Sequence, residues 1–200
     1  MRNIEVLDAL GRRLNREAGS PPIPWLFFFT DPRRTPDPCR IAARLPRGAA
    51  VVFRHFGMAD RRALAQRLAI LCRRRGLLLL IAADPALALA VGAGGVHWPE
   101  RWRGRRVAKR REGWIETASA HGRAGLARAG RMGMDACVLA PVFPSRSASA
   151  IHPLGPLKAG RLARAARVPV IALGGVQTGT AKRLPGRGFA GIAAVSGLVD

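Results

Sequence analysis

Residues 49–97 read AAVVFRHFGMADRRALAQRLAILCRRRGLLLLIAADPALALAVGAGGVH. Three short apolar runs, 49–53, 77–82 and 95–97, alternate here with two segments whose apolar residues recur at helical spacing. Bare apolar runs of this length are typical of parallel strands that are buried on both faces. The stretch therefore predicts an α/β fold in which βα units build a parallel sheet.

The same alternation continues over the rest of the chain. Five further strands are expected at Trp25–Phe29, Trp114–Thr117, Ala136–Leu139, Pro169–Leu173 and Gly191–Val195. Helices are expected at Asp60–Arg75, Pro85–Val91, His121–Met132, Pro156–Ala166 and Thr178–Leu184, and a loop at Arg101–Arg111. Eight strands in βα order favour closure into a compact (βα)8 TIM barrel over an open sheet.

The two ends of the chain depart from a full barrel. Apolar residues at helical spacing between Ile4 and Leu14 predict an N-terminal helix. The chain stops five residues after the eighth strand, so we expect a truncated last helix and an N-terminal helix that covers the gap. We expect residues 1–24 to form this helix and a loop, and residues 25–200 to form one barrel domain. The Pro-rich stretches 20–24 and 32–38 are interpreted as loops.

Composition excludes several classes of protein. The hydrophobic fraction of 48% is ordinary for a globular chain, in spite of a formal net charge of +22. The longest apolar stretch, 77–96, is interrupted by Asp84-Pro85, which argues against a membrane span. The three cysteines lie far apart, so neither a disulfide framework nor a zinc site built on them is expected. We therefore expect a cytoplasmic location.

The positive charge is almost entirely arginine and is densest between Arg101 and Arg111. Three interpretations stay open: a solvated face, a field that attracts small phosphorylated substrates, and a nucleic-acid surface. We expect any nucleic-acid binding to be non-specific, that is, sensitive to salt and blind to sequence.

Two glycine-bearing turns follow the seventh and eighth strands. In a barrel the active site lies at the carboxyl ends of the strands, so Gly174, Gly175, Ser196 and Gly197 predict a phosphate site. Glycine lets backbone N–H groups approach a phosphate closely. A bulky side chain at Gly175 is expected to fill the space of that phosphate and to leave the fold intact.

Other strand ends supply side chains that could take part in chemistry. Ser119 and His121 follow the fifth strand, and His121 is either an acid–base group or a structural histidine. His97, at the end of the fourth strand, is interpreted as structural. The acidic residues Asp31, Asp84 and Glu100 do not form an obvious Mg²⁺ cluster, so no metal ligand is assigned.

Several motifs resemble one known family in their order. The most specific are GAGGVH at 92–97 and PVFPSRS at 141–147, accompanied by SAH at 119–121, ALGGV at 172–176 and GIAAVS at 191–196. From about Trp25 to Gly197 the chain resembles the thiamine phosphate synthase and TenI family, whose fold is a compact (βα)8 barrel.

The resemblance implies a function in thiamine biosynthesis, with either of two reactions. The synthase branch joins a hydroxymethylpyrimidine diphosphate to a thiazole phosphate and releases pyrophosphate with Mg²⁺. The TenI branch includes a metal-free thiazole tautomerase that uses a histidine as acid and base. Either reaction implies a thiazole phosphate at the glycine turns, with His121 in the catalytic position. The residues for the pyrophosphate or substrate would be Arg54, Ser119, Ser145, Arg146 and Ser147.

The sequence departs from the synthase pattern on the metal and pyrophosphate side. After the second strand, Val52 and Phe56 stand where the synthase has Gln and Lys. Ala82 and Ala83 stand in place of its Asn-Asp pair, and Trp102 falls in its later acidic segment. We therefore expect a TenI-like protein that binds a small phosphorylated thiazole or thiamine precursor, with Mg²⁺ only if the chain is an active synthase.

Two alternatives stay open beside the tautomerase. One is a divergent thiamine phosphate synthase. The other is a non-catalytic basic barrel that binds RNA or a protein partner. The chain also allows a homo-oligomer.

Overall fold

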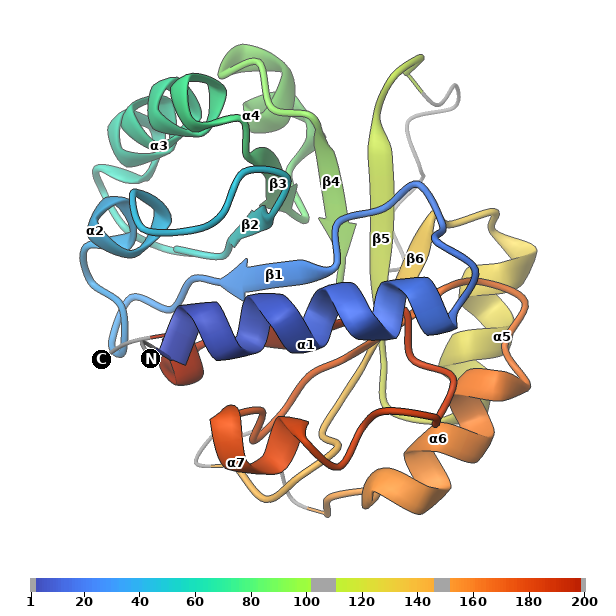
Figure 1. The fold of residues 1–200 in the computed structure, drawn as a ribbon. Coiled ribbons are helices and arrows are strands. Elements are labelled where there is room, and N and C mark those ends of the chain that lie inside the picture. Colours follow the sequence, from blue (N-terminus) through green and yellow to red (C-terminus); the bar gives the residue numbers. More distant parts are fainter. Residues whose placement is uncertain (1–2, 102–110, 146–151, 199–200) are drawn as a thin grey trace.

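The computed structural model describes residues 3–101, 111–145 and 152–198 of the chain. Eight parallel strands form a closed barrel in chain order, as the sequence predicted (Figure 1). They are β1 Leu26–Phe29, β2 Ala50–Phe53, β3 Leu78–Ala82, β4 Gly95–Trp98, β5 Ile115–Ala120, β6 Ala136–Leu139, β7 Val170–Ala172 and β8 Gly191–Ala194. The barrel closes where β1 pairs with β8, with Phe27 opposite Ala193.

Helices connect most of these strands on the outside of the barrel. They are α1 Asn3–Glu17, α2 Pro38–Ala42, α3 Arg61–Arg75, α4 Pro85–Ala90, α5 Arg123–Arg131, α6 Pro156–Arg164 and α7 Thr178–Ala181, followed by the 3-10 turn η1 Ser196–Leu198. No helix in these described ranges is both long and apolar enough to span a bilayer.

The structure differs from the sequence expectation at several element ends and in one missed helix. α7 ends at Ala181, three residues before the expected Leu184. β5 runs three residues past Thr117, so Ser119 lies within a strand instead of after it. The short helix α2 was missed because Pro38 was assigned to a Pro-rich loop. Its start follows ordinary helix signals: the Asp37 carboxylate accepts hydrogen bonds from the N–H groups of Cys39 and Arg40, and Pro38 occupies the first turn. The expected loop at Arg101–Arg111 lies almost wholly outside the described residues.

The core has two layers because side chains on a strand alternate between faces. Phe27, Phe29, Val52 and Leu80 belong to the cluster that fills the barrel interior. Phe28 points the other way and packs in the larger cluster between strands and helices. This filled interior leaves the strand ends as the place where a ligand can bind.

The N-terminal helix covers the side of the barrel where β1 meets β8. α1 packs against β8, β1 and η1, and it crosses the front of the barrel in Figure 1. Leu7 and Leu14 are fully buried there. The helix approaches the strand closely at Gly11, which has no side chain. A Cβ there would lie 2.8 Å from the carbonyl oxygen of Trp25. The expected N-terminal helix is thus present, and it packs where the first and last of the eight strands meet.

Candidate functional site

A cavity of about 1010 Å³ opens at the carboxyl ends of the strands. It brings together eight of the residues that the sequence singled out, namely Arg54, Ser119, His121, Ser145, Gly174, Gly175, Ser196 and Gly197. The other two, Arg146 and Ser147, lie outside the described residues. The geometry therefore gathers the candidate residues in one place, while their roles stay predictions.

On the β6–β8 side the cavity lining includes two successive glycines. Gly174 and Gly175 have φ angles of +93° and +63°, which favour glycine. The Gly174 carbonyl accepts a hydrogen bond from Phe143 N at 2.9 Å, and the Gly175 carbonyl accepts one from Thr180 Oγ1 at 2.7 Å. Within the described residues, the N–H groups of these two glycines donate to no acceptor. Successive uncommitted N–H groups beside a cavity are suited to binding an anion.

The same glycines are also needed for packing. A Cβ at Gly175 would lie 2.2 Å from the carbonyl oxygen of Pro144, and one at Gly174 would lie 2.6 Å from Pro141 Cα. At Gly197 it would lie 2.4 Å from the carbonyl oxygen of Val176. A side chain at Gly175 would therefore displace the loop after β6, and the expectation that a bulky residue there would leave the fold intact was wrong.

His97 forms a fixed polar bridge in the wall of the cavity. Its Nδ1 lies 2.8 Å from Thr117 Oγ1 and its Nε2 lies 2.8 Å from Ser119 Oγ. Its ring packs perpendicular to that of Phe29, with ring centroids 5.0 Å apart. Burial, assisted by the charge of Arg54, lowers the pKa of His97 to about 3. A neutral imidazole in this position holds the Ser119 hydroxyl in one orientation.

His121 stands at the mouth of the cavity, directly after β5. Its Nδ1 contacts Oε2 of Glu100, which follows β4, and its side chain is 50% exposed. This contact directs the other ring nitrogen, Nε2, away from Glu100. The sequence did not assign a role to Glu100, because the two residues are 21 positions apart and only barrel closure makes them neighbours.

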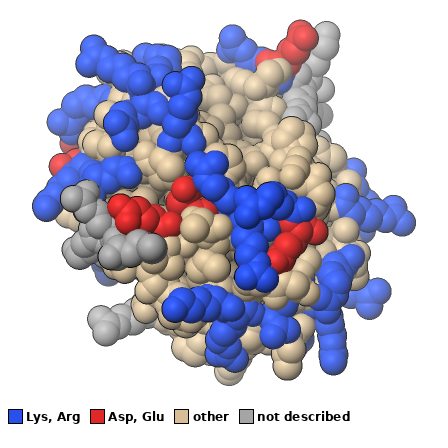
Figure 2. All heavy atoms as spheres, in the orientation of Figure 1, with Lys and Arg blue, Asp and Glu red and all other residues tan. Residues whose placement is uncertain are grey.

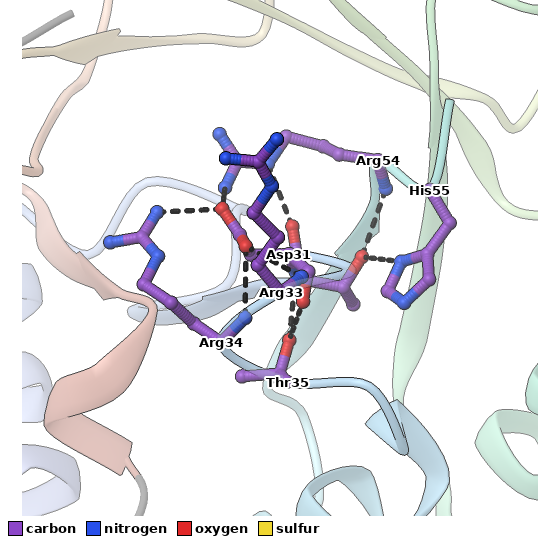
Figure 3. Close-up of polar contacts among 7 residues, drawn as sticks. Asp31, Arg33, Arg34, Thr35, Arg54 and His55 are labelled. Atoms are coloured by element: carbon purple, nitrogen blue, oxygen red, sulfur yellow. Dashed lines mark hydrogen bonds and ion pairs between the residues drawn. The ribbon is translucent and has the colours of Figure 1, made fainter. Parts of the chain in front are cut away.

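On the β1–β2 side, arginines are held by short polar contacts (Figure 3). Arg54 donates from Nε to the Thr30 carbonyl at 2.9 Å, while Thr30 Oγ1 lies 2.9 Å from both Arg54 N and His55 Nδ1. The Arg54 guanidinium lies 5.2 Å from the ring centre of Phe29. Burial lowers the pKa of Arg54 and the nearby Asp31 opposes that shift. The side chain is thus fixed along the cavity wall.

Arg34 lines the same wall and was also missed in the sequence. Its Nη2 donates to Asp31 Oδ2 at 2.8 Å, and its backbone N–H donates to Asp31 Oδ1 at 3.0 Å. Burial alone would raise the pKa of Asp31, but these hydrogen bonds and the Arg34 charge lower it to about 2. The position after β1 was the signal that could have identified Arg34.

The described residues do not fit the Mg²⁺ that the family resemblance implies. Asp84 accepts a hydrogen bond from Leu87 N at 2.9 Å and pairs with Arg61 Nη1 at 2.5 Å. Asp31 is held by Arg34, and Glu100 contacts His121. Over the described ranges no three His, Cys, Asp or Glu side chains converge in a way that would hold a metal ion. Mg²⁺ requires such oxygen ligands in a near-octahedral array.

Comparison with known proteins agrees with this geometry. A family model described as thiamine monophosphate synthase matches residues 26–198. A putative thiamine-phosphate synthase of Geobacter sulfurreducens is 34% identical over 139 residues, which cover 68% of this chain and 65% of that protein. The thiamine-phosphate synthase of Chlorobium luteolum is 34% identical over 188 residues, covering 90% of this chain and 87% of the other.

A solved structure, thiamine phosphate pyrophosphorylase from Pyrococcus furiosus, superposes with a TM-score of 0.75 at 25% identity, covering 88% of this chain and 87% of that one. The family-model match over residues 26–198 runs from β1 to η1 and includes every described residue that lines the cavity. The chain belongs to the thiamine phosphate synthase and TenI family, whose (βα)8 barrels act in thiamine biosynthesis.

Proposed function

We propose that this chain binds a thiazole phosphate in the cavity and catalyses its tautomerisation, as a TenI-type isomerase. The observation that carries the proposal is the pairing of His121 with Glu100 at a cavity whose opposite side offers backbone N–H groups to a phosphate. The substrate class follows from the family, and the choice of reaction follows from the side chains that are available.

The phosphate would bind at the turns after β7 and β8. The N–H groups of Gly174 and Gly175 are its donors, because neither bonds to another described residue. The Ser196 hydroxyl lines the same part of the cavity. With the phosphate bound here, the proposal places the thiazole ring toward His121, which lines the same cavity.

The pair of Glu100 and His121 suits a proton transfer. A carboxylate that accepts from Nδ1–H leaves the Nε2 lone pair as a base. A tautomerisation moves one proton from one substrate atom to another and shifts a double bond, so atoms and charge balance without a co-reactant. His121 would take the proton, hold it as an imidazolium beside the Glu100 carboxylate and return it at the second position.

The first test follows isomerisation of the thiazole carboxylate phosphate by NMR with the purified protein. His121→Asn is expected to lower the rate roughly 10²-fold or more, the usual scale for an acid–base group, with affinity within about threefold. The matched control is His152→Asn, because His152 is exposed and does not line the cavity. Absence of isomerisation by the unaltered chain, or an equal rate in the His121 variant, would contradict the proposal.

Glu100 is a positioning residue in this scheme. Glu100→Gln keeps the shape of the side chain but removes the charge that stabilises the imidazolium. We expect kcat to fall about tenfold or more with KM nearly unchanged. An equal change in KM would indicate that Glu100 shapes the cavity instead of assisting His121.

A second candidate is the synthase reaction, favoured by Arg34 and Arg54 on the β1–β2 wall, where two guanidiniums face the cavity. It is tested with hydroxymethylpyrimidine diphosphate, thiazole phosphate and Mg²⁺, following pyrophosphate release. We expect release at the background level, because the carboxylates of this side are engaged with Arg34 and Arg61. Robust turnover that EDTA abolishes would favour the synthase over the tautomerase.

A further inference from the structure

A second hollow lies on the outer surface of the barrel, away from the strand ends. It has a volume of about 630 Å³ and lies between α5 and the end of α6. Figure 1 shows these two helices side by side at the edge of the molecule. None of the residues that line it also lines the cavity at the barrel mouth. We call this hollow the α5–α6 groove.

The α5–α6 groove has an apolar floor. Leu126 and Ala127 of α5 face Leu162 of α6 and the two alanines, Ala165 and Ala166, that follow it. Leu126 is buried, while Leu162 and Ala166 are half-buried and Ala127 and Ala165 are exposed. Covering such a floor with another apolar surface removes apolar area from water and is therefore favourable.

Four arginines surround that floor. Arg123 and Arg131 belong to α5, Arg161 belongs to α6, and Arg167 follows it. All four are exposed, and none forms an ion pair with a carboxylate of the described residues. Figure 2 shows basic side chains along this margin of the molecule. The rim therefore presents positive charge that nothing within the described chain neutralises.

We propose that the α5–α6 groove binds an acidic amphipathic helix of another protein. The apolar side of such a helix would cover the floor, and its carboxylates would pair with the arginines of the rim. A second copy of this chain is a poor occupant, because each copy carries a formal net charge of +22. None of the described residues that line the groove is aromatic, so they do not provide the stacking surfaces that grooves for single-stranded nucleic acids use.

The experiment uses the full chain and a labelled synthetic peptide as the probe. The peptide carries leucines at three- and four-residue spacing on one helical face and glutamates on the others. Two further probes are compared with it: a scrambled peptide of the same composition and a single-stranded oligonucleotide. Fluorescence anisotropy over a range of salt concentrations gives the affinity and its dependence on charge.

Two variants separate charge from shape. Arg131→Gln with Arg161→Gln should weaken the peptide about tenfold and flatten the salt dependence, as expected for two rim charges that act together. Ala165→Phe, which fills the floor and keeps every charge, should weaken it about fivefold with the salt dependence unchanged. The matched control is Arg62→Gln with Arg74→Gln, two exposed arginines of α3 outside the groove, which should change affinity less than about twofold.

Several outcomes would overturn the proposal. They are no binding of the amphipathic peptide, equal binding of the scrambled peptide, an equal loss in the α3 control, or tighter binding of the oligonucleotide that the Arg131 and Arg161 changes abolish. A dimer that is seen by sedimentation and disrupted by Ala165→Phe would show that the groove binds a second copy of this chain instead of an acidic partner. A thermal melt of each variant shows whether it is folded.

Discussion

The two sides of the cavity mouth are made of the same kind of element, a loop after a parallel strand, but their polar groups are used differently. On the β6–β8 side, the N–H groups of Gly174 and Gly175 donate to no other described residue. On the β1–β3 side, Asp31 and Asp84 each accept hydrogen bonds from backbone N–H groups and pair with an arginine. The N–H groups of the first side are available to a ligand, whereas the carboxylates of the second side are engaged within the chain.

This difference shows that the presence of a residue type at a strand end does not make it a ligand. Asp84 lies one position from where the synthase pattern has an acid, yet its carboxylate caps α4. Gly174 and Gly175 carry no side-chain functional group. Their carbonyls accept hydrogen bonds within the chain, but their N–H groups do not donate to other described residues and are available to a ligand. What a site can bind depends on which groups the local fold leaves unpaired.

The largest effect is expected where a glycine turn is tightly packed. Gly175 and Gly57 lie in loops on opposite sides of the mouth, with φ angles of +63° and +72°. A Cβ at Gly175 would meet Pro144 O at 2.2 Å, whereas at Gly57 nothing lies within 4 Å. Gly175→Ala should therefore lower the free energy of unfolding by about 3 kcal/mol, and Gly57→Ala by about 1 kcal/mol from backbone strain alone.

Urea unfolding of both variants measures these two changes in the free energy of unfolding. Calorimetry with thiazole phosphate should also show weaker binding for Gly175→Ala and unchanged binding for Gly57→Ala. Similar losses of stability in the two loops would mean that the β7 turn is no more constrained than the β2 loop.

A smaller effect is expected for Asp31 and depends on pH. Because the folded pKa is lowered to about 2, the group stabilises the fold fully above its unfolded pKa of about 4, and this contribution is lost as the pH falls toward 2. Asp31→Asn should cost about 1–2 kcal/mol at pH 6, allowing for the partial exposure of the pair, and almost nothing at pH 2. Urea unfolding of both proteins across this range tests the sign. A difference that grows on acidification would contradict it.

The smallest effect is expected for Asp84. Asp84→Ala removes both the helix cap and the pair with Arg61 and should lower the unfolding free energy by about 1 kcal/mol, whereas Asp84→Asn keeps a capping side chain and should cost less. Both variants should bind thiazole phosphate within about twofold of the unaltered chain. A Mg²⁺-dependent gain in binding that Asp84→Asn removes would show that this carboxylate is a ligand and not only a cap.

Most of the fold was predictable because buried parallel strands carry a strong signal. Runs such as Val51-Val52-Phe53 and Leu78-Leu79-Leu80 are apolar on both faces, and all eight strands were located. The end of β5 was not, because Ser119 is polar and its burial against His97 depends on the neighbouring strand. α2 was missed because prolines dominated the interpretation of its surroundings, although Asp37 and Pro38 are a helix start.

The site was predictable to the level of which strand ends contribute, and not to the level of contacts. The position of His121 after β5 placed it at the mouth, but its contact with Glu100 needs β4 and β5 side by side. The crowding at Gly175 likewise needs the loop after β6. Such pairings are tertiary, and they decide which carboxylates and N–H groups are available.

The packing of α1 against β8 has a consequence for how the chain folds. The earliest described helix rests on the last strand, so its apolar residues Leu7 and Leu14 have no complete binding surface until residues 191–198 have been made. The ring of strands also closes only when β8 meets β1. These contacts join the two ends of the described chain and raise its contact order, which slows folding. During synthesis on a ribosome the helix therefore lacks this packing surface until β8 has been made, and barrel closure is a late step of folding.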